Sequence, residues 1–377
     1  MRSNLALLTI AACGLGFSSA AHGQGFGLPQ PSQNLSHRID LPRDSPVSLA
    51  GDEWGGSAAT VRGGAYVIDV RMSLSLKNTS QRRIRGITLT VVAQEATPGG
   101  KGSISVPSLD VAPGDMFSVH GDLHLLRPLG VDANPMVEVG LDGILFDDLT
   151  FYGPSRLNSR RSMLVWELEA RRDRQYFRAL LDQSGRDSLQ KEMLASLARD
   201  AERPQFGVQM VRGRATNTDA EKDLPFAFLQ FPDAPVEPMD GVARIAGNEA
   251  RAPKLVVHNR SARTVKSLEM GWIVRDQQGR EFLAAAMPYD IRLLPRGFSQ
   301  IQQDGALRFA PRTSVEGMTG YVANVEFADG SIWIPSRSEL DEATLRKVVA
   351  PSPEEQRLVQ IYRKRGLNAV IDELKKF

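Results

Sequence analysis

Cysteine is almost missing from this chain of 377 residues, because Cys13 is the only one. It lies in an N-terminal segment that we expect to be removed. The remaining chain would then contain no thiol, which excludes disulfide bonds and cysteine nucleophiles. A protein of this kind must be held together by its hydrophobic core alone.

Long apolar runs are also lacking. The run Leu5–Phe17 has 13 residues, too few for a membrane-spanning helix, which needs about 20. Arg2 precedes it, and small residues at 18–21 follow it, as in a secretory signal peptide. We therefore predict a signal peptide over residues 1–23, export to the periplasm or beyond, and no transmembrane helix in the mature chain. Ile10–Cys13 also resembles a lipobox, so lipid anchoring through Cys13 is the alternative.

An excess of charge of one sign is absent as well. The 46 basic and 44 acidic residues leave a net charge of +2, which argues against a nucleic-acid partner. The sequence contains no Gly-x-Ser-x-Gly, His-Glu-x-x-His or Ser-x-x-Lys motif. We predict that the protein is not an enzyme, has no catalytic residue, and binds no cofactor or metal.

What the chain does contain is an internal repeat. Asn78 and Asn259 stand in similar strand-turn-strand sequences (259 − 78 = 181), and other similar residues follow at the same spacing. The further pairs are Phe117/Phe298, Phe146/Phe327, Asp148/Asp329, Tyr152/Trp333, Pro154/Pro335, Arg156/Arg337, Gln175/Gln356 and Gly185/Gly366. One spacing over about 110 residues predicts a duplication of a whole structural unit.

Each unit begins with β-strands. Polar and apolar residues alternate over 67–76, the pattern of a strand with one buried face. Residues 84–92 and 265–274 are similarly β-branched, and Asp276–Gly279 and Asp329–Gly330 predict hairpin turns. The pattern resembles the immunoglobulin-like or fibronectin-III-like sandwiches of exported bacterial proteins. The likeness covers about 55–155 and 205–337, lacks the Cys…Trp…Cys framework, and implies architecture alone.

Each unit ends with a predicted helical hairpin. At the C-terminus, Ser352 suits an N-cap, Pro353 the first helical position, Glu355 a capping box, and Gly366 a left-handed helix end. Gly185 divides the corresponding helices of the first unit. Residues 162–170 fit a helix or a strand equally well.

The expected fold class is mainly β with α: two duplicated antiparallel, immunoglobulin-like β-sandwiches, each followed by a helical hairpin. The predicted boundaries, after the signal peptide, are a flexible linker over 24–50, a first sandwich over 51–157, a first hairpin over 158–203, a second sandwich over 204–338 and a second hairpin over 339–377.

Several residues invite a more specific interpretation. His120 and His124 flank Asp122, but on a strand they would stand about 13 Å apart, too far for one metal ion. Arg363–Arg365 fits the last turn of a helix, where cations complement the macrodipole. The arginines at 156, 160, 161, 171, 172, 174 and 178 alternate with acids, which is typical of a solvated surface. Residues 98–103 lack the spacing of a phosphate loop.

Asn34, Asn78 and Asn259 match the glycosylation sequon, although turns explain the latter two better. Taken together, these features predict a non-catalytic exported scaffold or binding protein. Its partner would be another protein or an envelope polymer, and its oligomeric state is open. The alternatives are a carbohydrate-binding or adhesion module using Tyr152 and Trp333, or a hydrolase whose site assembles from distant residues such as His120 and Asp122.

Overall fold

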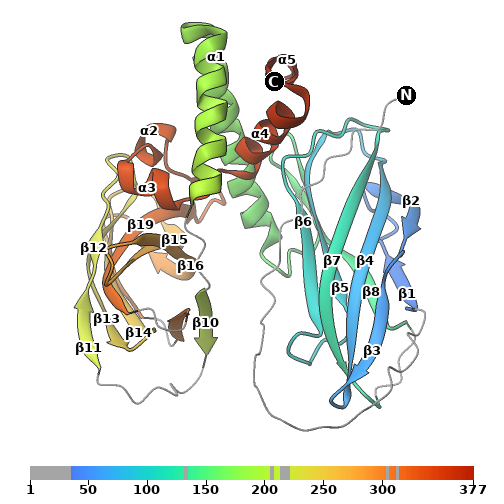
Figure 1. Ribbon diagram of the computed structural model, residues 1–377, viewed down its shortest axis with the longest axis horizontal. Helices are drawn as coiled ribbons and strands as arrows, with labels where there is room; N and C mark the ends of the chain where they lie inside the picture. Colours follow the sequence, from blue (N-terminus) through green and yellow to red (C-terminus); the bar gives the residue numbers. More distant parts are fainter. Residues whose placement is uncertain (1–34, 131–134, 204–207, 213–220, 303–304, 311–313) are drawn as a thin grey trace. The chain divides into compact units, whose positions relative to one another are not determined.

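The computed structural model describes residues 35–130, 135–203, 208–212, 221–302, 305–310 and 314–377. The predicted signal peptide, Cys13 and Asn34 lie outside the described residues. The chain divides into two compact units, Met1–Glu167 and Leu168–Phe377 (Figure 1). Both are rich in strands, so the protein is mainly β with a helical part, as the sequence predicts.

The first unit contains nine strands in two sheets that share one core. One sheet has the order β2-β4-β3, with β7 on the other side of β4, and the second has the order β1-β8-β5-β6, with β9 also on β8. The strands are β1 His37–Asp40, β2 Val47–Glu53, β3 Ala58–Arg62, β4 Ala65–Asn78, β5 Ile84–Val92, β6 Lys101–Val106, β7 Met116–Pro128, β8 Val137–Phe146 and β9 Phe151–Tyr152.

In its described residues, the second unit also has two sheets, and both contribute side chains to one core. The sheet orders are β10-β18-β14-β13-β11, with β17 on β14, and β12-β19-β15-β16, with β20 on β19. The strands are β10 Val208–Arg212, β11 Lys222–Pro225, β12 Ala227–Phe228, β13 Val236–Ala246, β14 Glu249–Asn259, β15 Val265–Asp276, β16 Glu281–Leu293, β17 Phe298–Gln302, β18 Gly305–Phe309, β19 Val315–Phe327 and β20 Ile332–Trp333.

The alternating segments form the strands that the sequence predicts. In β4, Ile68, Val70, Met72, Leu74 and Leu76 are buried, while the residues that alternate with them are more exposed. The turn Asp276–Gly279 joins β15 to β16, and Asp329–Gly330 joins β19 to β20. Hydrophobic burial on one face therefore fixes the register of the central strands.

The expected flexible linker over 24–50 is wrong where the structure describes it. Residues His37–Asp40 form β1 and pair in parallel with β8, and Val47 begins β2, which pairs with β4. Ile39 and Val47 pack against the core of the first unit. The glycine- and proline-rich composition of this segment predicts no strand, although these two apolar residues contact the core.

The two asparagine turns make the same hydrogen bonds. The Asn78 side chain is fully buried, donates to the carbonyls of Arg82 and Val111, and accepts from Ser80. Asn259 is equally buried, donates to the carbonyls of Arg263, Leu293 and Leu294, and accepts from Ser261. Each asparagine thus ties its turn to a neighbouring strand end.

An arginine clamp stands beside each of these turns. The Arg82 guanidinium lies 3.8 Å from the centre of the Phe146 ring and pairs with Asp148 at 3.7 Å. The same contacts are made in the second unit by Arg263, Phe327 and Asp329. Each clamp joins the turn after the long central strand to the final hairpin of the same unit.

The predicted equivalence of Phe117 and Phe298 is wrong by one residue. Lys77 pairs with Met116, whereas His258, which is 181 residues after Lys77, pairs with Phe298. Met116 and Phe298 therefore hold the same place, and both are strongly exposed, at 62% and 65%. Phe117 instead packs partly against the core.

The helices follow the predicted positions. Residues 162–170 belong to α1 Ser159–Glu202, and Gly185 (φ 80°, ψ −177°) divides α1 into two helices. The others are α2 Arg337–Leu340, α3 Ala343–Val348, α4 Pro353–Arg365 and α5 Leu367–Leu374. Gly366, between α4 and α5, has φ 80° and ψ 179°. This backbone region is open essentially to glycine alone, and it is not the left-handed helical conformation expected at Gly366.

The helical pairs pack on one another in the second unit. Phe177, Leu189 and Met193 of α1 share a core with apolar residues of α4 and α5. Those partners are Leu358, Val359, Val370, Ile371 and Leu374. One small helical core thus joins two helical pairs that lie far apart in the sequence.

Candidate functional site

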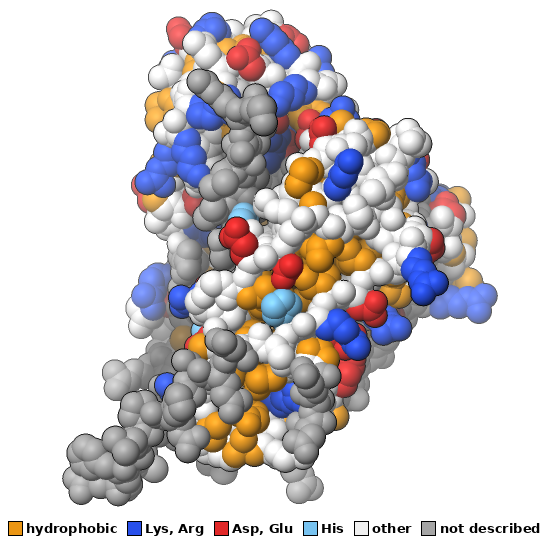
Figure 2. Space-filling view, turned by 90° about the vertical axis from the view of Figure 1, so that its right-hand side faces the viewer, with side chains coloured by type: hydrophobic (Ala, Val, Ile, Leu, Met, Phe, Trp, Pro, Cys, Tyr) orange, Lys and Arg blue, Asp and Glu red, His pale blue; other side chains and the backbone are white. Residues whose placement is uncertain are grey.

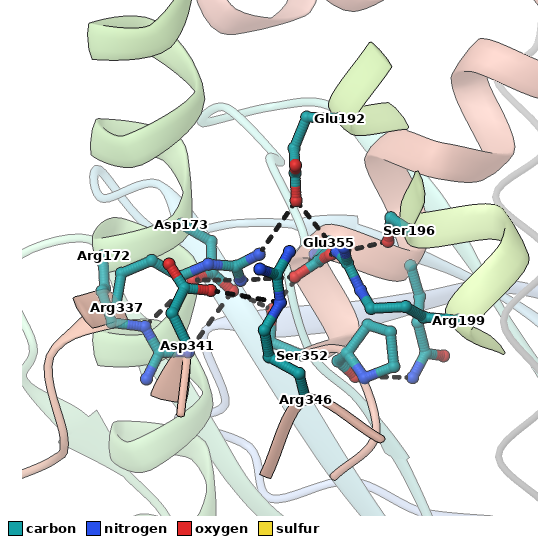
Figure 3. A network of polar contacts seen from close by, with 12 residues as sticks. Arg172, Asp173, Glu192, Ser196, Arg199, Arg337, Asp341, Arg346, Ser352 and Glu355 are labelled. Atoms are coloured by element: carbon teal, nitrogen blue, oxygen red, sulfur yellow. Dashed lines mark hydrogen bonds and ion pairs between the residues drawn. The ribbon is translucent and has the colours of Figure 1, made fainter. Parts of the chain in front are cut away.

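A polar cavity of ≈ 50 Å³ lies beside this helical core, large enough for a few water molecules. Figure 3 shows its charged side chains, which come from α1, α2, α3 and the start of α4. Its lining residues are Arg172, Arg199, Arg337, Leu340, Asp341, Leu345, Arg346, Val349, Ala350, Pro351, Ser352 and Glu355.

Glu355 is the centre of the network. Its carboxylate, only 2% exposed, accepts hydrogen bonds from Arg337 at 2.6 Å, Arg199 at 3.1 Å and Ser196 at 2.6 Å. The sequence places Glu355 in a capping box, and half of that motif is present, because the Ser352 hydroxyl accepts from the Glu355 N–H. The other half is wrong, since the carboxylate is directed to the arginines.

Arg337 connects several elements. Besides Glu355, its guanidinium lies 3.5 Å from Asp173 and 3.6 Å from Glu192 of α1, and 4.7 Å from the centre of the Tyr176 ring. Ser336 caps α2 with a full capping box, which fixes the helix start from which Arg337 projects. One side chain thus joins the first helical turn of α2 to both halves of α1 and to α4.

Asp173 forms the second acidic centre and is fully buried. It accepts from Arg172 at 2.9 Å and from the Ser352 hydroxyl at 2.5 Å. Arg172 also donates to the Pro335 carbonyl at 3.1 Å. The Ser352 hydroxyl therefore accepts a hydrogen bond from the first turn of α4 and donates one to Asp173 of α1.

Charge pairing sets the ionisation of these groups. Burial alone would raise the pKa of Glu355, but the hydrogen bond and positive charge of Arg337 outweigh it and lower that pKa. Burial likewise opposes the charge on Arg337, yet its pKa is raised by Glu355 and Asp173. Both groups are therefore ionised at neutral pH.

The arrangement is suited to holding helices together. Its three acids, Asp173, Glu192 and Glu355, are each paired with arginine, and the nearby Asp341 forms a separate exposed pair with Arg346. Ser196 and Ser352 donate to carboxylates that are themselves bound to arginines. The cluster acts as an ionic clamp between α1, α2 and α4.

A second acidic cluster lies between α1 and β15. Burial, with the nearby charges of Asp173 and Glu269, raises the pKa of Glu169 to about 7 in spite of Arg172. Glu269 accepts from the Asn324 side chain at 2.7 Å, and burial raises the pKa of Tyr321 on β19. Glu169 therefore opposes the fold when it ionises.

His120, Asp122 and His124 lie on β7, all exposed on its outer face. The β4–β7 register runs from Ala65↔Pro128 to Lys77↔Met116 without a shift, so no bulge at Gly121 brings the histidines together. His124 pairs with Asp69 at 2.5 Å. In the part of the chain that the structure describes, no group of three or more His, Cys, Asp or Glu residues could hold a metal ion.

The arginine-rich stretch is only partly the solvated surface that the sequence predicts. Arg156 and Arg178 are exposed, but Arg174 is 5% exposed and Arg172 belongs to the ionic clamp. Arg174 pairs with the buried Glu354 at 3.5 Å. Because Glu167 and Asp173 are buried too, the helix has a polar buried face.

The remaining candidates lie at structural positions. Arg363–Arg365 forms the exposed last turn of α4. Gly99 and Gly100 stand in the turn before β6. Tyr152 and Trp333 end the final hairpins of their units, and both are half-buried against the cores.

The surface also carries apolar side chains. Figure 2 shows a gathering of hydrophobic side chains on the face it presents, with a histidine and charged residues around it. The large exposed hydrophobic residues of the described chain are Leu49, Val61, Met116, Leu126, Leu129, Leu157, Leu194, Met239, Leu294 and Phe298.

Comparisons with known proteins give little further guidance. No family model matches the chain, and no curated protein matches it. A solved C-terminal globular domain of an oligosaccharyltransferase from Pyrococcus abyssi is 11% identical, with a TM-score of 0.15. The match covers 77% of this chain and 48% of that one, and at this TM-score it carries no argument. Of the helices in the described residues, none is long and apolar enough to cross a membrane.

Proposed function

We propose that this protein is a non-catalytic exported scaffold that binds another protein or an envelope polymer through its β-rich units. Export is an expectation from the N-terminal sequence, which predicts a periplasmic or secreted protein. The observation that carries the proposal is the ionic clamp. The charged side chains that line the cavity join helices, and its ≈ 50 Å³ volume suits water rather than a substrate.

We further propose that the two units are duplicated immunoglobulin-like sandwiches. The matched asparagine turns and arginine clamps support this, since each keeps its hydrogen bonds and ring contact at a spacing of 181 residues. Gly185 and Gly366 add the same unusual backbone conformation at the same spacing. The repeated features hold turns and hairpins in place, which fits a scaffold whose specificity lies on its surfaces.

Affinity capture from the native envelope, followed by titration of the purified chain with the captured partner, tests the binding function. We expect one saturable partner whose binding survives substitution of His120 or Asp122, since neither residue has a catalytic role in this account. The proposal would be refuted if products formed from a substrate were recovered with the chain. It would equally be refuted by substrate turnover that either substitution abolishes.

A carbohydrate-binding or adhesion module is the second candidate. It is favoured by the partial exposure of Tyr152 and Trp333, because aromatic rings that reach the surface can stack on sugars. Titration with glycan fragments of the envelope distinguishes the two. Binding that is lost in both Tyr152→Ala and Trp333→Ala, with the fold intact, would favour this candidate.

A further inference from the structure

We infer that two copies of this chain associate through the open edge of β7, which joins their four-stranded sheets into one. The partner strand is β7 of the second copy, antiparallel, with Gly121 facing Gly121. This self-association requires no other ligand. Its failure would therefore leave the proposed binding function untouched.

The first support is the shape of the edge. β7 has 13 residues and pairs with β4 along its whole length without a bulge. Among the residues that the structure describes, no strand pairs with its other side. Proteins normally protect such edges with short strands, bulges, proline, inward-pointing charges or a covering loop, and on β7 these devices gather at one end, where Pro128, the buried Arg127 and the turn at Gly99 lie, which leaves the stretch Ser118–His124 open. A long, regular edge of this kind is a template for another strand.

The second support is the direction of the main-chain groups. The Leu126 N–H points away from β4, because it donates to the Gly99 carbonyl at 2.8 Å. The register has no shift, so the N–H and C=O groups of the other even-numbered residues point the same way. The side chains of these residues are all exposed: Met116, Ser118, His120, Asp122, His124 and Leu126.

The third support is self-complementarity. With Gly121 opposite Gly121, His120 faces Asp122 twice across the two-fold axis, and Ser118 faces His124. These are directly opposed positions, where a histidine N–H can donate a hydrogen bond to the facing carboxylate or hydroxyl. Beyond these pairs the Leu126 N–H is already bound to the Gly99 carbonyl, so the proposed pairing runs over Ser118–His124.

The neighbouring registers are worse, which makes this one specific. A shift of the pairing in one direction places His120 opposite His120 and Met116 opposite His124. A shift in the other direction places Asp122 opposite Asp122, and two carboxylates facing each other are destabilising. Of these three registers, the proposed one alone places Asp122 opposite a histidine.

The second unit shows that this kind of edge accepts an added strand. There, β14 carries β17 and β18, as β4 carries β7, and β10 extends the sheet by pairing antiparallel with β18 from Val208↔Phe309 to Arg212↔Gly305. In the described part of the first unit, the turn at Gly99 lies against Leu126 at the end of this place, and no strand pairs with the rest of it. We therefore place the second copy where the second unit has its extra strand.

Analytical ultracentrifugation tests the inference on the full chain, expressed with its own N-terminal segment and purified after export. We expect a monomer–dimer equilibrium below a total concentration of about 100 µM. Ser118→Pro removes an outward N–H without touching the β4 ladder, and it should raise the dimer Kd at least about tenfold. The matched control is Gln300→Pro on β17, at the place that Ser118 holds on β7, which should leave the Kd unchanged.

A charge swap tests the register. His120→Asp places two acids opposite each other twice and should weaken the dimer about tenfold or more. The double variant His120→Asp with Asp122→His restores the facing pairs in reversed order and should recover most of the affinity. Circular dichroism confirms folding of every variant.

Three results would overturn the inference. The first is a monomer at every concentration up to about 100 µM. The second is a dimer that Ser118→Pro and Gln300→Pro affect equally. The third is a double variant that dimerises no better than His120→Asp alone, which would exclude the proposed facing of His120 and Asp122.

Discussion

Replacing Glu355 with glutamine should lower the free energy of unfolding of the second unit, because it removes one charge from the centre of the ionic clamp. The substitution keeps the volume of the side chain and can still accept from Ser196. It leaves Arg337 and Arg199, at 2.6 and 3.1 Å, without their shared carboxylate. Breaking a buried pair from one side typically costs about 3–5 kcal/mol. Arg337 keeps Asp173 and Glu192 within 3.6 Å, so we expect the lower end, about 3 kcal/mol.

Urea denaturation at pH 7, followed by circular dichroism and tryptophan fluorescence, measures this loss without screening the charges. The matched control is Asp341→Asn, which removes an exposed ion pair to Arg346 at 3.6 Å and should cost less than about 1 kcal/mol. The pKa of Glu355 is lowered in the fold, so its contribution is present at neutral pH and is lost as the pH falls through the folded-state pKa. Equal effects of the two substitutions would refute the assignment of the clamp as a stabilising device.

Other predictions concern Glu169, the hairpin glycines and the turn asparagines. The pKa of Glu169 is raised to about 7, so wild-type stability should fall as the pH rises from about 4.5 to 7. Glu169→Gln should remove up to about 3 kcal/mol of that fall. Urea titrations at pH 5 and pH 8 check this, and an unchanged pH dependence in the variant would contradict it. Gly366→Ala and Gly185→Ala should each cost about 1–3 kcal/mol through backbone strain alone, because no atom lies within 4 Å of the added Cβ; thermal unfolding measures this, and a neutral effect would argue against the positive φ. Asn78→Ala and Asn259→Ala should each cost about 2–4 kcal/mol, from several buried hydrogen bonds of about 1 kcal/mol each, and Asp at either position should be no better because it lacks the donating amide; a loss at one position only would show that the turns differ.

The strands could be predicted because one buried face imposes a period of two. Residues 84–92 coincide with β5, and the turns at Asp276–Gly279 and Asp329–Gly330 are where the sequence places them. The repeated spacing of 181 also located the asparagine turns and both hairpin glycines. These features depend on local chemistry, which a single sequence displays.

The ionic clamp could not be predicted, because its residues come from four separated segments. Over 162–170 the apolar pattern was ambiguous, since the buried face of α1 includes the charged Glu167 and Asp173. Glu167 and Asp173 share one helical face with Leu164 and Ala170, but charged residues in a sequence normally mark the exposed face of a helix. The repeat does place two fully buried acids, Asp173 and Glu354, 181 residues apart (354 − 173 = 181), but only Asp173 belongs to the clamp, since Glu354 pairs with Arg174 and Arg357.

The prediction of a flexible linker over 24–50 is wrong for a related reason. Short strands such as β1 gain their stability from pairing with a distant strand, here β8, and composition reports only local preference. The one-residue error at Phe298 likewise arose from a coincidence of residue type. The strand register, which decides exposure, assigns Phe298 to the position of Met116.

The most direct test of the central claim, that the buried polar chemistry of this chain holds a binding scaffold together, is a turnover measurement. The purified chain is incubated with panels of ester, peptide and glycoside substrates, beside Glu355→Gln and the Asp341→Asn control. The account predicts rates equal to the buffer blank for all three proteins. Turnover by the wild type that disappears in Glu355→Gln, while the folded fraction stays the same, would contradict it.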